Sequence, residues 1–163
     1  MNQAERIRVG SEFECFVAQL YSKDGWDAET KKRMVGKSGV EYEVDVYLER
    51  GRKKAIVECK YKDYGGVSIA EVALLMLKMD DIDIKDGIIV TNSVMPESAS
   101  LVAKRYGLLY VDGDELKNLA RKYNMRMNFR IDSNPIADVV RSAFNLANDF
   151  GIFKSPRTII KSG

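Results

Sequence analysis

The stretch from residue 41 to residue 62 constrains the fold more than any other part of the sequence. Apolar and polar side chains alternate over residues 41–48, so neighbouring residues would point to opposite faces of a β-strand. Arg50-Gly51-Arg52 then supplies a turn, and residues 54–62 are apolar enough for a returning strand. The pattern predicts a β-hairpin. Its expected apolar face carries Tyr42, Val44, Val46 and Leu48, and its polar face carries Glu41, Glu43, Asp45 and Tyr47.

Helix and strand patterns on both sides of this hairpin predict an α/β protein. Residues 5–21 carry an apolar stripe at helical spacing, and Ser68 with Glu71 forms a capping-box pattern that opens a helix reaching about residue 79. Pro96 begins a further helix, which ends before Gly107. The other predicted elements are strands at 26–30, 88–90 and 108–111, a polar, basic loop at 31–39, and helices at 114–123 and 135–149. This order is typical of a sheet with helices on both faces.

Charge is spread unevenly over the 163 residues. The formal net charge is only +2, but Lys and Arg outnumber Asp and Glu by nine to three in residues 117–163. Such a basic end is typical of a surface that faces a polyanion, and a solvated surface rich in lysine and arginine explains it equally well. We expect one domain over residues 1–122, followed by a basic helical extension over residues 123–163 that stands apart or packs on the same domain.

The absence of histidine restricts the chemistry that this chain can perform. It excludes Ser-His-Asp and Cys-His catalysis and zinc held by histidine, so carboxylates, lysines, hydroxyls and a hard metal ion remain. The two cysteines, Cys15 and Cys59, do not form a Cys-x-x-Cys pair. No apolar run approaches the roughly 20 residues of a membrane span, and the first residues lack the apolar stretch of a signal peptide. We therefore expect a cytoplasmic protein.

Two carboxylates and a lysine are expected to meet on the predicted hairpin. Residues two apart on a strand share a face, so Glu58 lies with Lys60, and Asp45 lies on the polar face of the first strand. If these faces coincide, Asp45 and Glu58 repel each other and favour a cation between them. Mg²⁺ or Mn²⁺ prefers such oxygen ligands and can polarise a scissile phosphate. The pattern indicates phosphodiester hydrolysis, with Lys60 orienting water or stabilising the transition state.

A simpler interpretation of the Glu-x-Lys pattern is a salt bridge across strands. Taken alone, that interpretation is the more common one, at roughly nine cases in ten. The surrounding residues favour catalysis, because Glu58 and Lys60 interrupt an otherwise apolar strand over residues 55–61. Charges inside such a strand need a partner or a function.

Four segments of the chain resemble the PD-(D/E)xK nuclease superfamily, and within it the catalytic domain of Mrr-like restriction endonucleases. They occur in the family's order and together span roughly residues 4–120. The resemblance implies an αβββαβ core, a mixed central sheet flanked by helices, and a metal-dependent DNA endonuclease activity. The segments are Gly10-Ser-Glu-Phe-Glu14 in the opening helix, Gly39-Val-Glu-Tyr-Glu-Val-Asp45-Val, Ile56-Val-Glu58-Cys-Lys60-Tyr, and the closing β-α-β portion with Gly87-Ile-Ile-Val-Thr91-Asn-Ser93 and Leu109-Tyr-Val-Asp112.

The same resemblance assigns roles to individual residues. Asp45 and Glu58 would be metal ligands together with the Cys59 carbonyl, and Lys60 would be the catalytic lysine. Glu14 would complete the site through a water or a second metal. Many Mrr-like domains carry Gln at the position of Glu58, so this chain keeps the more general acid.

Two further glutamates leave alternatives open. Glu12 is the weaker helix candidate, because it points in a different direction around the helix from Glu14. Glu43 stands two residues before the predicted metal-binding Asp, where glycine is common in the family. Glu43 contributes either to the metal site or only to the polar face.

DNA is the expected partner, and several basic residues are candidates to contact its phosphates. One expected partner is a second copy of the chain in a homodimer, because nucleases that cut both strands often work as symmetric pairs. The alternative is a larger assembly in which another partner supplies target choice. Rival interpretations are a Holliday-junction resolvase and a non-catalytic nucleic-acid-binding module of the same fold. The DNA-contacting candidates are Lys31, Lys32, Arg33, Lys37 and Lys62.

Overall fold

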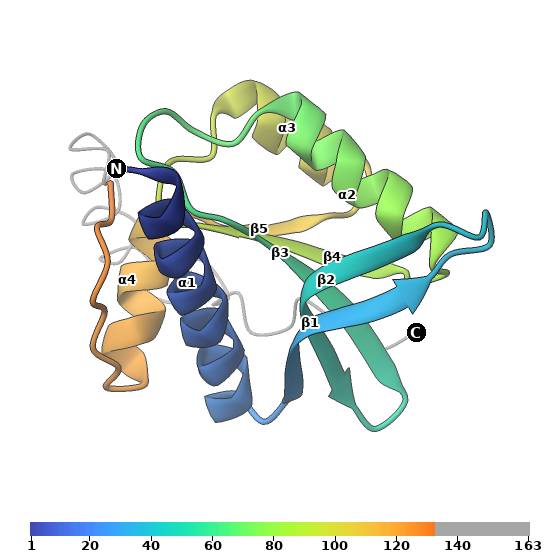
Figure 1. Ribbon diagram of the computed structural model, residues 1–163, viewed down its shortest axis with the longest axis horizontal. Coiled ribbons are helices and arrows are strands. Elements are labelled where there is room, and N and C mark those ends of the chain that lie inside the picture. The colour runs from blue at the N-terminus through green and yellow to red at the C-terminus, as the bar shows by residue number, and fades with distance from the viewer. Residues whose placement is uncertain (133–163) are drawn as a thin grey trace, which may run out of the picture.

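A computed structural model describes residues 1–132 of the protein (Figure 1). The element order confirms the predicted α/β fold, with a helix, three strands, and then helices alternating with strands. The helix expected at 135–149 lies outside the described residues. No helix within residues 1–132 is long and apolar enough to cross a membrane. The elements are α1 (Gln3–Lys23), β1 (Asp27–Val35), β2 (Glu41–Arg50), β3 (Lys53–Lys60), α2 (Ile69–Asp81), β4 (Asp86–Thr91), α3 (Glu97–Arg105), β5 (Leu109–Val111) and α4 (Gly113–Lys122).

The strands form one mixed sheet in the order β1-β2-β3-β4-β5. β1, β2 and β3 pair antiparallel, while β3, β4 and β5 pair parallel. α1 and α4 cover one face of the sheet, and α2 and α3 cover the other (Figure 1). We call the two hydrophobic layers the α1-side core, which contains Phe13, Val17 and Val57, and the α2-side core, which contains Ile56 and Leu75.

Capping side chains begin α1 and α2. The Asn2 side chain accepts a hydrogen bond from the Glu5 backbone N–H at 2.8 Å. Ser68 and Glu71 form the predicted capping box at the start of α2. Gly107 has a φ of +74°, the left-handed conformation expected of the residue that ends α3. These local signals explain why the helix boundaries agree with the sequence pattern to within a few residues.

The predicted loop at residues 31–39 is wrong for residues 31–35, because β1 continues to Val35 and its residues pair with β2 on both sides of Lys31. Exposed and half-buried residues alternate along β1, as in a half-covered strand. Lys32 occupies one of the half-buried positions, beside Met34. Its ammonium lies 4.3 Å from the centre of the Tyr47 ring, so a long cationic side chain takes the place of an apolar one and hides the alternation.

The predicted face assignment along β2 is wrong on one side of Asp45. Val46 and Leu48 belong to the α1-side core, whereas Val44 belongs to the α2-side core together with Tyr47. Regular alternation would put Val44 with Val46, so the alternation slips by one residue at Asp45. Pairing between β2 and β3 runs from Arg50 back to Val46 and goes no further. Beyond Val46, β2 therefore leaves the central sheet with β1 as a two-stranded ribbon (Figure 1).

The residues that follow α4 pack on the same domain as far as residue 132. The Phe129 ring contacts Phe13 and Phe16 edge to face, at centroid distances of 5.1 and 5.0 Å. The Asp132 backbone N–H donates to the Asn92 carbonyl at 2.9 Å. This stretch therefore covers part of the α1-side core.

Candidate active site

The site forms at the point where β2 separates from β3. There the Cys59 backbone N–H donates a hydrogen bond to Asp45 Oδ2 at 2.7 Å. Because β2 bends away from β3 here, the Cys59 N–H has no backbone carbonyl of β2 to bind. The Asp45 carboxylate accepts its hydrogen bond instead. Asp45 consequently lies against the backbone of β3 next to Glu58.

Glu58 is held by two lysines, one on each carboxylate oxygen. Lys60 Nζ lies 2.7 Å from Glu58 Oε1, and Lys78 Nζ lies 2.7 Å from Glu58 Oε2. The Glu58 side chain is only 14% exposed, and that of Lys78 only 15%. In such surroundings a carboxylate is stable only with opposite charges beside it, so the two lysines offset the cost of burying Glu58.

The two carboxylates have pKa values that move in opposite directions. Burial, followed by repulsion from Glu58, raises the pKa of Asp45 to about 6. Burial also acts to raise the pKa of Glu58, but hydrogen bonds and charge from Lys60 and Lys78 outweigh it and lower that pKa. For Lys60, burial favours the neutral amine, yet the bond to Glu58 prevails and raises its pKa. Lys60 is therefore an ammonium ion at neutral pH. The positive charge near Asp45 is too small to offset the burial and repulsion that act on its carboxylate.

Glu14 reaches the same region from α1. Among the described residues its Oε2 atom is buried without a hydrogen-bond partner. Lys31 Nζ lies 3.7 Å away, which makes an ion pair but is too long for a hydrogen bond. Burial raises the pKa of Glu14, and the nearby charge of Asp45 adds to the rise. Glu12, by contrast, is bonded to Arg8 on the outer surface of the helix.

The donors available here suit a hard divalent cation. Asp45, Glu58 and Glu14 offer carboxylate oxygens, one of which is buried and unpartnered. The raised pKa values of Asp45 and Glu14 show that added positive charge would stabilise the site. Within residues 1–132, no three of the Asp, Glu, Cys and His side chains are gathered closely enough to hold an ion by themselves. A metal would therefore also need backbone oxygen, such as the Cys59 carbonyl, or water.

The basic residues suggested by the sequence are dispersed. Lys31 lies beside Glu14 and donates to Ser11 Oγ at 2.8 Å. Lys62 follows Lys60 by two residues and pairs with Glu71 at 2.6 Å. The other three candidates lie on the β1–β2 ribbon, paired with acidic side chains. Those pairs are Lys32 with Glu29, Arg33 with Glu41, and Lys37 with Asp83.

Sequence reasoning missed Lys78. It is the only basic residue of α2, and it follows an apolar run, Leu74 to Leu77. Besides Glu58, its ammonium donates to the Glu43 carbonyl at 3.1 Å, which ties α2 to the strand carrying Asp45. A single lysine in an apolar helix is the signal that marks such a residue.

Asn92 is the second residue that sequence reasoning missed. It follows β4 and is fully buried. Its side chain accepts from the Lys62 N–H at 2.6 Å and donates to the carbonyls of Lys62 and Arg130, each at 3.0 Å. Asn92 thereby fixes the chain just beyond Lys60. Its signal in the sequence is a polar Thr-Asn-Ser triplet directly after a buried strand.

The family of the domain follows from comparison with known proteins. Residues 8–120 match the family Mrr_cat, described as restriction endonuclease. The chain belongs to this family. The domain is thus a nuclease domain of the restriction-endonuclease type, with DNA as its substrate class. Nucleases of this type generally use divalent metal ions. A search of curated proteins found no match.

Several solved structures share the fold of this chain. "Protein of Unknown Function AF1548" has a TM-score of 0.63 and 23% identity, with 81% of this chain and 77% of that chain covered. Can2 from Sulfobacillus thermosulfidooxidans, solved with cyclic tetra-adenylate, has a TM-score of 0.58 and 16% identity. Protein VC1899 from Vibrio cholerae has a TM-score of 0.54 and 22% identity. The matches cover 76% and 75% of this chain but only 38% of Can2 and 35% of VC1899.

Proposed function

We propose that this domain is a metal-dependent DNA endonuclease that hydrolyses phosphodiester bonds with Mg²⁺ or Mn²⁺ at Asp45, Glu58 and Lys60. One observation carries the proposal. Where β2 leaves β3, the Asp45 carboxylate binds the Cys59 N–H, and Glu58 and Lys60 flank that same residue. This arrangement collects two partly buried carboxylates and a cation at an opening in the sheet, as phosphodiester hydrolysis requires.

Each residue has a role that follows from its surroundings. Asp45 and Glu58, with the Cys59 carbonyl, would hold the metal ion, because they offer hard oxygen ligands at one point. When bound, the ion supplies Lewis acidity toward the scissile phosphate and the attacking water. Lys60 is protonated, so it acts as a cation and hydrogen-bond donor toward the phosphate oxygens and not as a base.

Glu14 is suited to orient the attacking water. Its buried Oε2 has a free acceptor site, and the raised pKa brings the carboxyl closer to the range of a proton acceptor near neutral pH. In the reaction, the water oxygen bonds to phosphorus as one water proton leaves toward a carboxylate. The bond from phosphorus to the leaving oxygen breaks, and that oxygen takes up a proton from solvent. Glu14 lies on the α1 side of the site, opposite the lysine that holds Glu58 from α2.

A plasmid-cleavage assay tests the proposal. Supercoiled plasmid is incubated with the wild-type protein in Mg²⁺, in Mn²⁺ and in EDTA, and nicked and linear products are separated on agarose. We expect cleavage only with metal, and a loss of at least a hundredfold in Lys60→Ala, a typical cost for removing one transition-state charge contact. Linear product without accumulation of nicked circles would indicate that paired copies cut both strands.

A matched control separates chemistry from folding. Lys54 lies on the same strand and is exposed at its other end, so Lys54→Ala keeps the composition change but leaves the site intact. Circular dichroism and DNA binding by fluorescence anisotropy are measured for both variants. Metal-dependent cleavage by Lys60→Ala at the wild-type rate would refute the site assignment. Failure of the wild type on plasmid, single-stranded and branched DNA, combined with DNA binding, would favour a binding module.

A further inference from the structure

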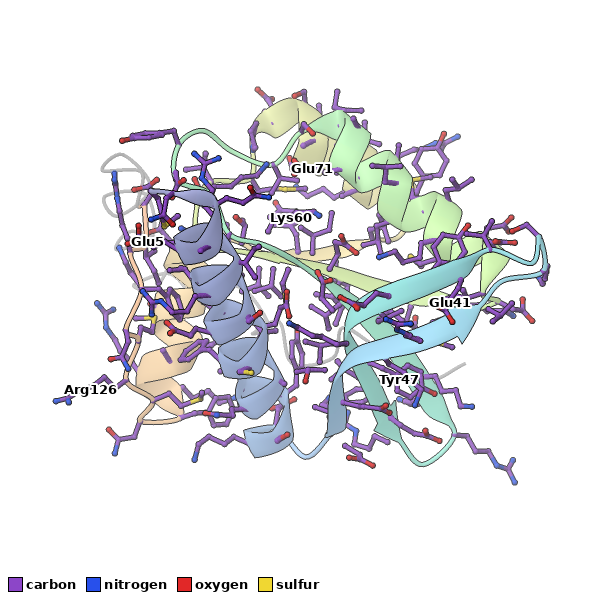
Figure 2. The ribbon with its side chains drawn as sticks, in the orientation of Figure 1. Glu5, Glu41, Tyr47, Lys60, Glu71 and Arg126 are labelled. Atoms are coloured by element: carbon purple, nitrogen blue, oxygen red, sulfur yellow. The ribbon has the colours of Figure 1, made fainter. Side chains whose placement is uncertain are left out.

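An open cavity of about 510 Å³ lies beside the proposed catalytic lysine. Its floor is the end of β3 and the residues that follow, including Lys60 and Lys62. One wall is the N-terminal half of α1 and the other is the start of α2, where Glu71 lies. Figure 2 shows Lys60 in the space between these two helices, with Glu71 across from it. The volume falls within the range of roughly 300–1,000 Å³ typical of small-molecule sites.

Tyr64 lines this cavity and is unusually exposed for an aromatic residue. The residue is 84% exposed, the highest value among the large hydrophobic residues of the described chain. It follows β3 by four residues and precedes Gly65, whose φ of +74° turns the chain toward α2. The Arg130 guanidinium lies 6.0 Å from its ring centre. An aromatic ring presented to solvent beside a nuclease site is a surface on which a flat ligand can stack.

The charges around the cavity suit a ligand with a phosphate at one end. Lys60, Lys62 and Arg6 line it, and each is paired with a carboxylate, Lys60 with Glu58. Lys62 pairs with Glu71 at 2.6 Å, and Arg6 lies 3.4 Å from Asp63. These pairs hold the Lys62 and Arg6 side chains in place beside the cavity. Lys60 belongs both to the proposed catalytic site and to the cavity lining. A phosphate bound to Lys60 would therefore place the neighbouring nucleotide of the ligand beside the cavity.

We propose that this cavity receives an unstacked nucleobase of the DNA strand next to the scissile phosphate, and that the base stacks on the Tyr64 ring. The inference rests on the proposed nuclease function and adds a substrate preference to it. Bases of an intact duplex are stacked on one another, so the enzyme must extrude a base or act where one is already unpaired. The domain therefore prefers DNA with a single-stranded or mismatched nucleotide at the cleavage point.

Binding and cleavage are measured together on one set of oligonucleotides. The set contains a single strand, the matching duplex and a duplex with one mismatch, each also made with an abasic nucleotide at successive positions. Binding is followed by fluorescence anisotropy in Ca²⁺ and cleavage by single-turnover assay in Mn²⁺. The variants are Tyr64→Ala, Tyr64→Phe and Tyr106→Ala. Tyr106 is a matched control, because it is an exposed tyrosine that lines a different cavity.

Stacking of one base on an aromatic ring contributes about 1–3 kcal/mol, so Tyr64→Ala should weaken single-strand binding about 5- to 150-fold. Tyr64→Phe and Tyr106→Ala should bind as the wild type does. An abasic nucleotide at one position should weaken wild-type binding equally and add nothing in Tyr64→Ala. The inference would be overturned if Tyr64→Ala bound single-stranded DNA as tightly as the wild type does, or if no abasic position reproduced its loss of binding. Cleavage by the wild type would in either case leave the nuclease proposal standing. Absence of both binding and cleavage by the wild type would overturn both.

Discussion

Asp45→Asn should make the metal-free protein more stable at neutral pH while removing its activity. The reason is that Asp45 is a partly buried carboxylate beside Glu58, and these surroundings raise its pKa from 3.8 to about 6. A raised pKa means that the folded protein disfavours the charged form. At 1.36 kcal/mol per pKa unit, the ionised carboxylate costs the fold about 3 kcal/mol at pH 8. Asparagine removes that charge and has nearly the same size.

The hydrogen bond from the Cys59 N–H opposes this cost, and the pKa of about 6 already includes its effect. The expected increase in the free energy of unfolding is therefore about 3 kcal/mol at pH 8. The size of the gain depends on pH, because the cost of the charged Asp45 shrinks as pH falls below the folded pKa toward the ordinary value of 3.8. At pH 4.5 the variant should be more stable than the wild type by only about 1 kcal/mol.

Urea denaturation of both proteins in EDTA, at pH 8 and at pH 4.5, measures this difference directly. Repeating the pH 8 measurement with Mn²⁺ should stabilise the wild type more than the variant, since a ligand stabilises only the fold that binds it. A variant less stable than the wild type at pH 8 would refute the electrostatic reasoning. A difference that stays the same at both pH values would refute it as well, because it would trace to packing and not to charge.

Two further substitutions test the contacts that hold the site together. Lys78→Met should lower the free energy of unfolding by about 1–2 kcal/mol, because Glu58 keeps one of its two cations. In a double-mutant cycle with Glu58→Gln we expect a coupling energy above about 0.5 kcal/mol, and additive effects would show that the pair contributes nothing. Asn92→Ala should cost about 3 kcal/mol, since it leaves a backbone N–H and two carbonyls without their partner, including both groups of Lys62. A loss below about 1 kcal/mol in urea denaturation would contradict that estimate.

The sequence predicted the element order because its signals are local. The Ser68 and Glu71 capping box fixes the start of α2, and Gly107 fixes the end of α3. The proximity of Asp45 to Glu58 was also predictable, since a hairpin of known turn brings fixed positions opposite one another. β1 was underestimated, because Lys32 lies where an apolar residue would have marked the strand.

The bend that opens the site is a long-range effect and leaves little trace in the local pattern. α2 holds the β1–β2 ribbon at two points after it leaves the sheet. Near the site, Lys78 donates to the Glu43 carbonyl, and at the far end the Ser38 N–H donates to Asp81 Oδ1 at 2.8 Å. The slip at Asp45 puts Val44 into the core beneath the same helix. A valine can pack on either face of the sheet, so alternation in the sequence cannot show that the strand slips by one residue. The side to which Val44 turns is decided by its contacts with the layer beneath α2, which is distant in the sequence.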